Sequence, residues 1–204
     1  MIRKTTIAVL LAAAAHAQDA APRHELGLTL GTLRGGDRGT GAAALQLGSG
    51  TALQANYGVR VAGGSAAALY AEFHFLASPQ RLVSSANAAL TRDVATIYAT
   101  PGLRVKFAPK ARVSPYAVIG AGYALYEHSL LTLGGQPNGA PRLTHRGTAM
   151  FGGGVDVGVW RWLAIRGEVR DFYSGSPSYN TPAIRGGQHN VVAGGGFVLR
   201  FGGR

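Results

Sequence analysis

Residues 163–173, Leu-Ala-Ile-Arg-Gly-Glu-Val-Arg-Asp-Phe-Tyr, alternate between two kinds of side chain. Successive residues of an extended strand point to opposite sides, so Leu163 and Ile165 share one face while Arg166 and Glu168 share the other. One face is apolar and the other carries ions of both signs. This pattern indicates a strand that separates two different environments.

The same two-residue period recurs along the chain and predicts an all-β protein. We place eight strands at about 24–33, 50–62, 65–77, 94–107, 113–128, 146–159, 163–173 and 188–201. Pro101 fits its strand poorly, because proline has no N–H to donate to a sheet ladder. We therefore expect either a bulge at Pro101 or a strand that begins after it.

The connections between these strands alternate in length. Three are tight, at 63–65, 109–111 and 160–162, and four are long, at about 34–49, 78–93, 129–145 and 174–187. Outer-membrane barrels of up-and-down topology have short periplasmic turns and long external loops. With a periplasmic N-terminus, the first, third, fifth and seventh connections should be the long ones, and they are.

The tight connection at 160–162 also predicts a register. If Val159 and Leu163 lie opposite each other and both face outward, then Asp156 lies opposite Arg166 on the inner face. Opposite charges form a favourable cross-strand pair at such positions.

The first residues indicate a secretory signal peptide. Arg3 and Lys4 precede an apolar run, Ile7–Ala15, and Ala15-His16-Ala17 supplies small residues at a cleavage site. We expect residues 1–17 to be removed and residues 18–204 to form one barrel domain. After residue 17 no apolar run approaches the roughly 18 residues of a membrane helix, so strands would have to hold the protein in a membrane.

Composition excludes several classes of function. The formal net charge is +11, but the basic residues are scattered singly, and an exported protein is separated from nucleic acid, so we expect no nucleic-acid partner. Charged residues make up 14% of the chain, against about 25% in typical soluble domains. The absence of cysteine excludes disulfides, thiol nucleophiles and Cys-ligated metals.

The polar face of the strands should line the inside of the barrel. Eight strands leave just enough room for side chains to fill the lumen, and charges buried there must be paired. The expected lumen charge cluster, with a structural role, consists of Arg60, Glu72, Arg104, Asp156, Arg166, Glu168, Arg170 and Arg200. In a soluble barrel this face would meet water and should be denser in Lys, Glu and Thr than the mixture of charges, Gly, Ala and Tyr found here.

Aromatic residues offer a second indication of a membrane barrel, which carries aromatic girdles at both interfaces. Phe107, Trp160, Trp162 and Phe201 fall at the expected periplasmic end, and Phe73, Phe75, Tyr123, Phe151 and Tyr173 fall near the outer end. The alternative is that they are ordinary strand aromatics, which strands favour in any case.

Residues that could carry chemistry are few. Glu127-His128-Ser129 has the residue types of a hydrolytic triad, but adjacent strand residues point to opposite faces, so we interpret them as polar residues at a strand end. The histidines after residue 17, at positions 24, 74, 128, 145 and 189, show no close-spaced ligand pair. We expect no catalytic residue, no metal site and no cofactor.

Basic residues of the long connections allow two interpretations. Arg34, Arg38, Arg81, Arg92, Arg142 and Arg185 either contact the anionic phosphates of lipopolysaccharide or are simply solvated loop charges.

Four segments, at 102–107, 114–123, 152–159 and 197–201, resemble the outer-membrane β-barrel family that includes the outer membrane protein A-like and opacity-type porin-like small barrels. The resemblance implies an eight-stranded transmembrane barrel in the cell outer membrane, a monomer surrounded by lipid and lipopolysaccharide. Members typically end on an aromatic residue, whereas here Phe201 is followed by Gly-Gly-Arg. These segments are signals of the fold and not of an activity.

We therefore expect a non-enzymatic integral outer-membrane protein that anchors external loops for envelope-structural or surface-interaction roles. A filled lumen argues against a general diffusion pore. Two alternatives stay open: a lipid A-modifying barrel enzyme, as some small outer-membrane barrels are, and a soluble periplasmic barrel that binds a small ligand. The sequence identifies no external partner.

Overall fold

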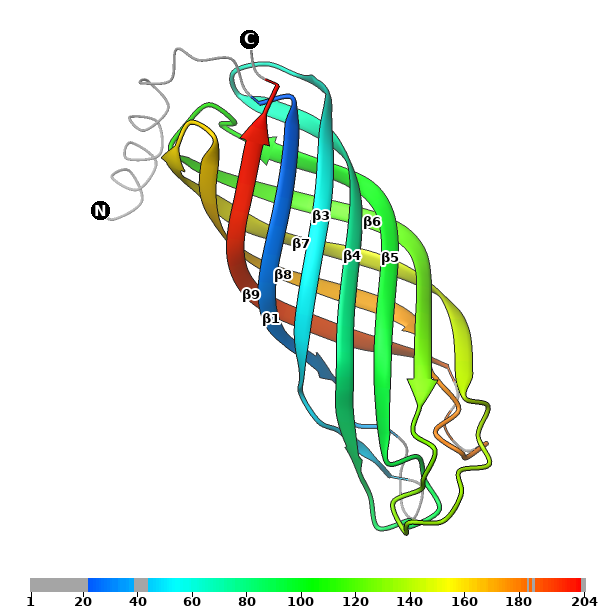
Figure 1. Cartoon of the computed structure of the whole chain (residues 1–204). Coiled ribbons are helices and arrows are strands. Elements are labelled where there is room, and N and C mark those ends of the chain that lie inside the picture. The colour runs from blue at the N-terminus through cyan, green and yellow to red at the C-terminus, as the bar shows by residue number, and fades with distance from the viewer. Residues whose placement is uncertain (1–21, 39–43, 183, 185, 203–204) are drawn as a thin grey trace, which may run out of the picture.

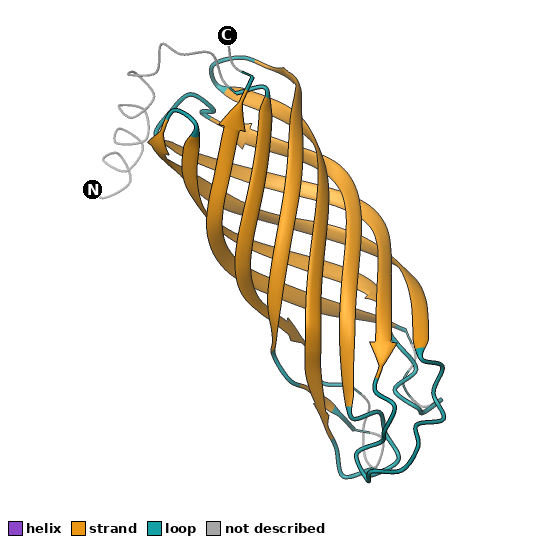
Figure 2. Ribbon diagram, in the orientation of Figure 1, coloured by secondary structure: helices purple, strands orange, loops and turns teal. Residues whose placement is uncertain are grey.

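The computed structural model describes residues 22–38, 44–182, 184 and 186–202. The predicted signal peptide at 1–17 and the loop residue Arg185 lie outside the described residues. Within the described residues, no helix is long and apolar enough to cross a membrane. The strands (Figure 2) are β1 His24–Gly35, β2 Gln46–Leu47, β3 Gly50–Gly63, β4 Ala67–Ser84, β5 Asp93–Phe107, β6 Val113–His128, β7 Leu143–Trp160, β8 Leu163–Gly175 and β9 Gly187–Phe201.

Eight of these strands close into a ring, as the sequence predicts. Hydrogen-bonded neighbours follow the order β4-β3-β1-β9-β8-β7-β6-β5, and β5 pairs with β4 to close the sheet. All pairings are antiparallel, and β2 only extends the sheet beside the end of β4. In Figure 1 the last strand, β9, lies beside the first, β1, the short turns share one end of the barrel, and the long connections gather at the other.

The two faces of the sheet are those expected from the alternation in β8. Ile165 and Val169 are 50% and 53% exposed on the outer surface, whereas Arg166 and Glu168 are 1% and 4% exposed in the lumen. The apolar side chains therefore coat the outside of the cylinder, where lipid replaces water. An inside-out arrangement with an apolar core and a charged exterior, as in a soluble barrel, is excluded.

Pro101 lies inside β5, so both expectations for it were wrong. The pairs with β6 continue from Ala99↔Tyr123 to Gly102↔Gly120 without a shift of register. Only the pairs at Pro101 and at the residue before it are missing. The strand thus accommodates a missing N–H by leaving a short gap in one ladder, while Pro101 still pairs with Phe73 of β4 on its other side.

The register of the β7–β8 hairpin was predicted correctly at its centre and wrongly at its tip. Asp156 lies opposite Arg166, as expected, but Leu163 lies opposite Trp160 and not opposite Val159. The register shifts between Gly158 and Trp160, so Val159 is an extra residue on one strand. Such a bulge leaves a shorter turn than the one expected.

β4 continues beyond the predicted strand and corrects the assignment of Arg81. The connection expected at 78–93 begins only after Ser84, and a register shift between Ser78 and Arg81 precedes this extension. Arg81 is therefore a fully buried lumen residue and not an exposed loop residue. β4 and β7 each contain 18 residues, whereas about 9–11 residues cross a bilayer, so these two strands are longer than a bilayer crossing requires.

The aromatic residues named as girdle candidates all lie on the outer surface of the barrel. Trp160 and Trp162 stack on each other beside the short turns, with ring centroids 5.7 Å apart. The exposed set at this end is completed by Phe107 and Phe201. Of the five expected near the outer end, Tyr123 and Tyr173 lie nearer the loops. Phe75 and Phe151 lie at the middle of their strands and Phe73 lies nearer the short turns, so these three were placed too far outward.

A charge on the lipid face should destabilise the barrel. Val169 lies in the middle of β8 and faces outward, so we expect Val169→Arg to lower the free energy of unfolding in lipid vesicles by about 2–4 kcal/mol. Val169→Leu is the matched control and should change it by less than about 0.5 kcal/mol. Urea titrations followed by tryptophan fluorescence measure both, and equal midpoints for the two variants would contradict a lipid-facing Val169.

Candidate functional site

The lumen is crossed by a network of ion pairs between buried side chains, which we call the ion network. It consists of Glu25, Glu72, Asp156 and Glu168 with Arg104, Lys106, Arg166, Arg170 and Arg200. These side chains come from β1, β4, β5, β7, β8 and β9. They point inward because they occupy alternate positions along strands whose other face is apolar.

Asp156 accepts from several cations in the half of the network nearer the short turns. Its carboxylate accepts hydrogen bonds from Arg166 Nε at 2.7 Å and Arg166 Nη2 at 3.0 Å, which is a bidentate ion pair. Lys106 Nζ lies 2.6 Å from the same carboxylate, and Arg200 Nη2 lies 3.7 Å from it. One carboxylate thus joins β7 to β5, β8 and β9.

Glu25 is the second carboxylate of this half. It lies 2.5 Å from Lys106 Nζ and 2.8 Å from Arg104 Nη2. Neither Glu25 nor Lys106 was in the expected cluster. Both follow from the same alternation, since Glu25 precedes the outward Leu26 and Leu28, and Lys106 lies two positions after Arg104.

Glu72 and Glu168 extend the network toward the loops. Glu72 pairs with Arg104 at 2.7 Å and with Arg170 at 2.9 Å. Glu168 accepts from Arg170 Nε at 2.9 Å and from the Tyr116 hydroxyl at 2.7 Å.

Arg60 is the one expected member that the structure does not bring into the network. Its side chain is half-buried near the short-turn end, and it forms no ion pair with a described residue. The remaining expected residues, from Glu72 to Arg200, lie together.

Inward glycines give these bulky side chains their space. A Cβ on Gly58 would lie 2.7 Å from Arg104 Nη2, and a Cβ on Gly154 would lie 2.7 Å from the Tyr116 hydroxyl oxygen. A larger residue at either position would displace a guanidinium or a tyrosine ring. The glycines of the inner face therefore leave the space that the large side chains opposite them occupy.

The loop end of the lumen is closed by apolar side chains, which we call the outer plug. Its members are Leu33, Leu45, Leu47, Leu76, Val83, Leu90, Val94, Tyr179, Ile184 and Val192. They come from strand ends and from three of the long connections. Burial raises the pKa of Tyr179 to about 12, so its hydroxyl stays protonated and donates to Gln188 Oε1 at 3.1 Å.

The long connections above the plug are tied to one another. Leu133 N donates to Leu90 O at 2.8 Å, and Thr91 N donates to Tyr179 O at 3.2 Å. The Asn180 side chain also donates to Ala89 O at 2.8 Å. Three loops that are far apart in sequence therefore form one cap.

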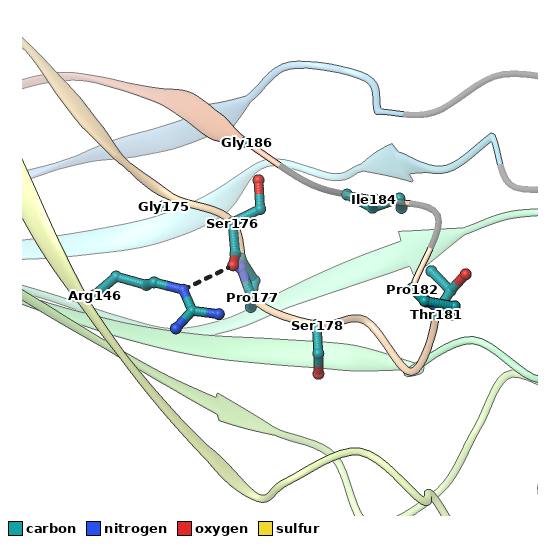
Figure 3. Close-up of a pocket in the computed structure, with 9 residues that line it drawn as sticks. All are labelled: Arg146, Gly175, Ser176, Pro177, Ser178, Thr181, Pro182, Ile184 and Gly186. Atoms are coloured by element: carbon teal, nitrogen blue, oxygen red, sulfur yellow. Dashed lines mark hydrogen bonds between the residues drawn. The ribbon is translucent and has the colours of Figure 1, made fainter.

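A hollow of about 370 Å³ opens in this cap beside the connection from β8 to β9 (Figure 3). Arg146 Nε donates to Ser176 O at 3.1 Å, and Arg38 Nη2 donates to Ser176 Oγ at 2.6 Å. The hollow is lined by Arg146, Gly175, Ser176, Pro177, Ser178, Thr181, Pro182, Ile184 and Gly186. A guanidinium among hydroxyls and backbone groups suits an anionic group better than an apolar one.

Glu127, His128 and Ser129 do not converge. Glu127 pairs with Arg142 at 2.6 Å, and the His128 ring contacts Pro141 O through Nδ1 at 2.7 Å. The Ser129 hydroxyl donates to Leu131 O at 2.8 Å, which holds a loop. In the described part of the chain, no cluster of three or more His, Asp or Glu side chains could hold a metal ion.

Comparison with known proteins agrees with this geometry. The family model described as "Outer membrane protein beta-barrel domain" matches residues 5–201. No curated protein matches the chain in sequence.

Several solved structures share the fold. The outer membrane protein OprG from Pseudomonas aeruginosa superposes with a TM-score of 0.56 at 14% identity, covering 90% of this chain and 97% of OprG. Neisserial surface protein A gives 0.54 at 12% identity, with 87% and 97% covered. The outer membrane protein AlkL, determined in lipid bilayers, gives 0.52 at 11% identity, with 92% and 94% covered.

Removing the charge of Asp156 should cost more stability than breaking an exposed ion pair. Asp156→Asn leaves Lys106 and Arg166 with less compensation in the lumen, so we expect a loss of about 3–5 kcal/mol in the free energy of unfolding. Glu127→Gln, which breaks the exposed pair with Arg142, is the control and should cost less than about 1 kcal/mol. Urea unfolding in lipid vesicles measures both losses. If Asp156→Asn lowers the free energy of unfolding no more than the control does, Asp156 does not hold the ion network together.

Proposed function

The chain belongs to the outer membrane protein β-barrel domain family and lies in the cell outer membrane, and from that premise we propose that it is a monomeric, non-enzymatic anchor for an external loop cap. In this proposal the barrel conducts no general flow of solutes. Its task is to hold the cap at the cell surface, where the loops contact lipopolysaccharide and external partners.

The burial of the lumen side chains carries this proposal. Arg104, Lys106, Arg166, Tyr98 and Phe172 are all at most 1% exposed, although they line the inside of an open-ended cylinder. Side chains that are buried from water in this way leave no continuous aqueous path along the axis. The outer plug blocks the lumen at a second level, beneath the loops.

The construction of the cap supports a role for its surface. β4 and β7 are longer than a bilayer crossing requires, and the loops are hydrogen-bonded to one another above the plug. A surface held in one arrangement loses little conformational entropy when it binds a partner.

Lipopolysaccharide is the first partner that the charges favour. Arg34 is exposed on the outer face near the end of β1, and the described residues provide it with no acidic partner. Arg146 is exposed at the hollow of Figure 3. Guanidinium groups bind phosphate oxygens through paired N–H donors.

A lipid A-modifying activity is less well supported. Catalysis by a serine needs a base within hydrogen-bond reach of the hydroxyl, and Ser129 instead holds the loop backbone while His128 contacts Pro141.

The closed lumen predicts the result of a flux measurement. Liposomes that contain the folded protein should swell in isosmotic arabinose no faster than protein-free liposomes, because the ion network and the plug block the axis. A general porin reconstituted in parallel shows that the assay detects an open channel. Swelling comparable to that porin would contradict the proposed anchor.

The exposed arginines predict how lipopolysaccharide binding responds to mutation. Arg34→Gln and Arg146→Gln should each weaken binding about fivefold, given about 1 kcal/mol per arginine near an anionic membrane surface. Arg92→Gln is the matched control, because Arg92 is already paired with Asp93 at 3.1 Å. Affinities are measured with purified lipopolysaccharide and the folded protein in detergent. Unchanged binding by the double variant would exclude these arginines as the contact.

A further inference from the structure

Arg81 is a buried cation outside the ion network. Its side chain is 0% exposed on β4, in the stretch of the strand between Leu76 and Val83, two members of the outer plug. Nη1 donates to Asn190 Oδ1 at 2.7 Å, and Nη2 donates to Thr96 Oγ1 at 3.0 Å. Both partners are neutral, so these bonds satisfy donors without balancing the charge.

The described acidic residues do not supply that balance. Glu25, Glu72, Asp156 and Glu168 pair within the ion network. Asp93, Glu127 and Asp171 pair with Arg92, Arg142 and His189, and Asp37 is exposed. A charge held in a low-dielectric interior without an opposite charge is unfavourable unless an ion or a strong dipole compensates it.

The polar groups around Arg81 present further donors. Arg81 Nε, Asn190 Nδ2 and Ser78 Oγ are buried and have no hydrogen-bond partner among the described residues. Because Asn190 Oδ1 accepts from Arg81, the Asn190 amide N–H groups are left to donate elsewhere.

Two glycines make room for these groups. A Cβ on Gly50 would lie 2.5 Å from Arg81 Cγ and 2.8 Å from Ser78 Oγ. A Cβ on Gly35 would lie 3.2 Å from both Arg81 Nη1 and Asn190 Oδ1. The backbone therefore approaches Arg81 closely from two strands and encloses the donors.

We propose that the outer half of the lumen binds one small inorganic anion, of the size of chloride or bromide, on Arg81 with Asn190 and Ser78 as further donors. A guanidinium with neutral N–H and O–H donors is the chemistry that recognises an anion and repels a cation. Enclosure by the outer plug limits the site to a small ion. The site is independent of the lipopolysaccharide contacts, which lie on the outer surface.

The test compares anions at constant ionic strength. Urea unfolding of the full folded protein in detergent is measured in the sodium salts of chloride, bromide and gluconate, the last being too large for the site. An ion that binds only the folded state shifts the folding equilibrium about tenfold for each tenfold rise in its concentration above its Kd. We expect chloride and bromide to raise the unfolding midpoint relative to gluconate.

Variants separate the site from general salt effects. Arg81→Met should abolish the difference between chloride and gluconate, whereas Arg92→Met, which alters an exposed arginine, should retain it. The proposal is overturned if the wild-type midpoint is the same in all three salts, or if Arg81→Met keeps the full difference.

A direct observation covers the case in which Arg81→Met does not fold. Crystals of the wild-type protein grown in bromide should give an anomalous peak within about 3.5 Å of Arg81 Nε and Asn190 Nδ2, the range of hydrogen bonds to a halide. Absence of a peak there at full bromide occupancy elsewhere would reject the site.

Discussion

Most charges inside this barrel are held by opposite charges that reach them across the lumen. Burying an ion costs several kcal/mol, roughly, unless it is paired and its hydrogen-bonding groups are satisfied. Four carboxylates and five cations are paired with opposite charges in the ion network. Because their strands are not all neighbours in the sheet, the pairs also fix the shape of the cylinder. A register slip in one strand would expose its ions to lipid and leave their partners alone.

That constraint explains which parts of the fold the sequence predicts. The alternation of side chains between the two faces of a strand is a local property. The sequence of β8 alone therefore predicts that Ile165 faces outward and Arg166 inward, and the length of one hairpin predicts that Asp156 lies opposite Arg166. Prediction fails where an extra residue resets the alternation: after Arg60, before Arg81 and at Val159. Only Pro79, between Ser78 and Arg81, marks one of these bulges in the sequence.

The ion network could be predicted in composition but not in pairing. Every second residue of a strand faces the lumen, and this rule identifies the members of the network. Applied to every strand, the rule would also have included Glu25 and Lys106. It would still not pair them with each other, since they are 81 residues apart in the chain and face each other from β1 and β5. Contacts of this kind depend on ring closure and on the stagger of all the strands. The same holds for the loop cap, in which Leu90, Leu133 and Tyr179 meet only after the barrel has formed.

Division of the lumen into two levels links the fold to the cell surface. The level nearer the short turns is compensated charge, and the level under the loops is mainly apolar, with Arg81 and its polar neighbours set among the plug residues. The loops are therefore held from below by their own buried side chains. Lipid contacts are then left to the outer face of the strands. Barrels with only 11–14% identity share the fold, which means that many sequences can form it. Residues that the fold itself does not require, such as those of the loop cap and those around Arg81, are the ones free to differ between such barrels.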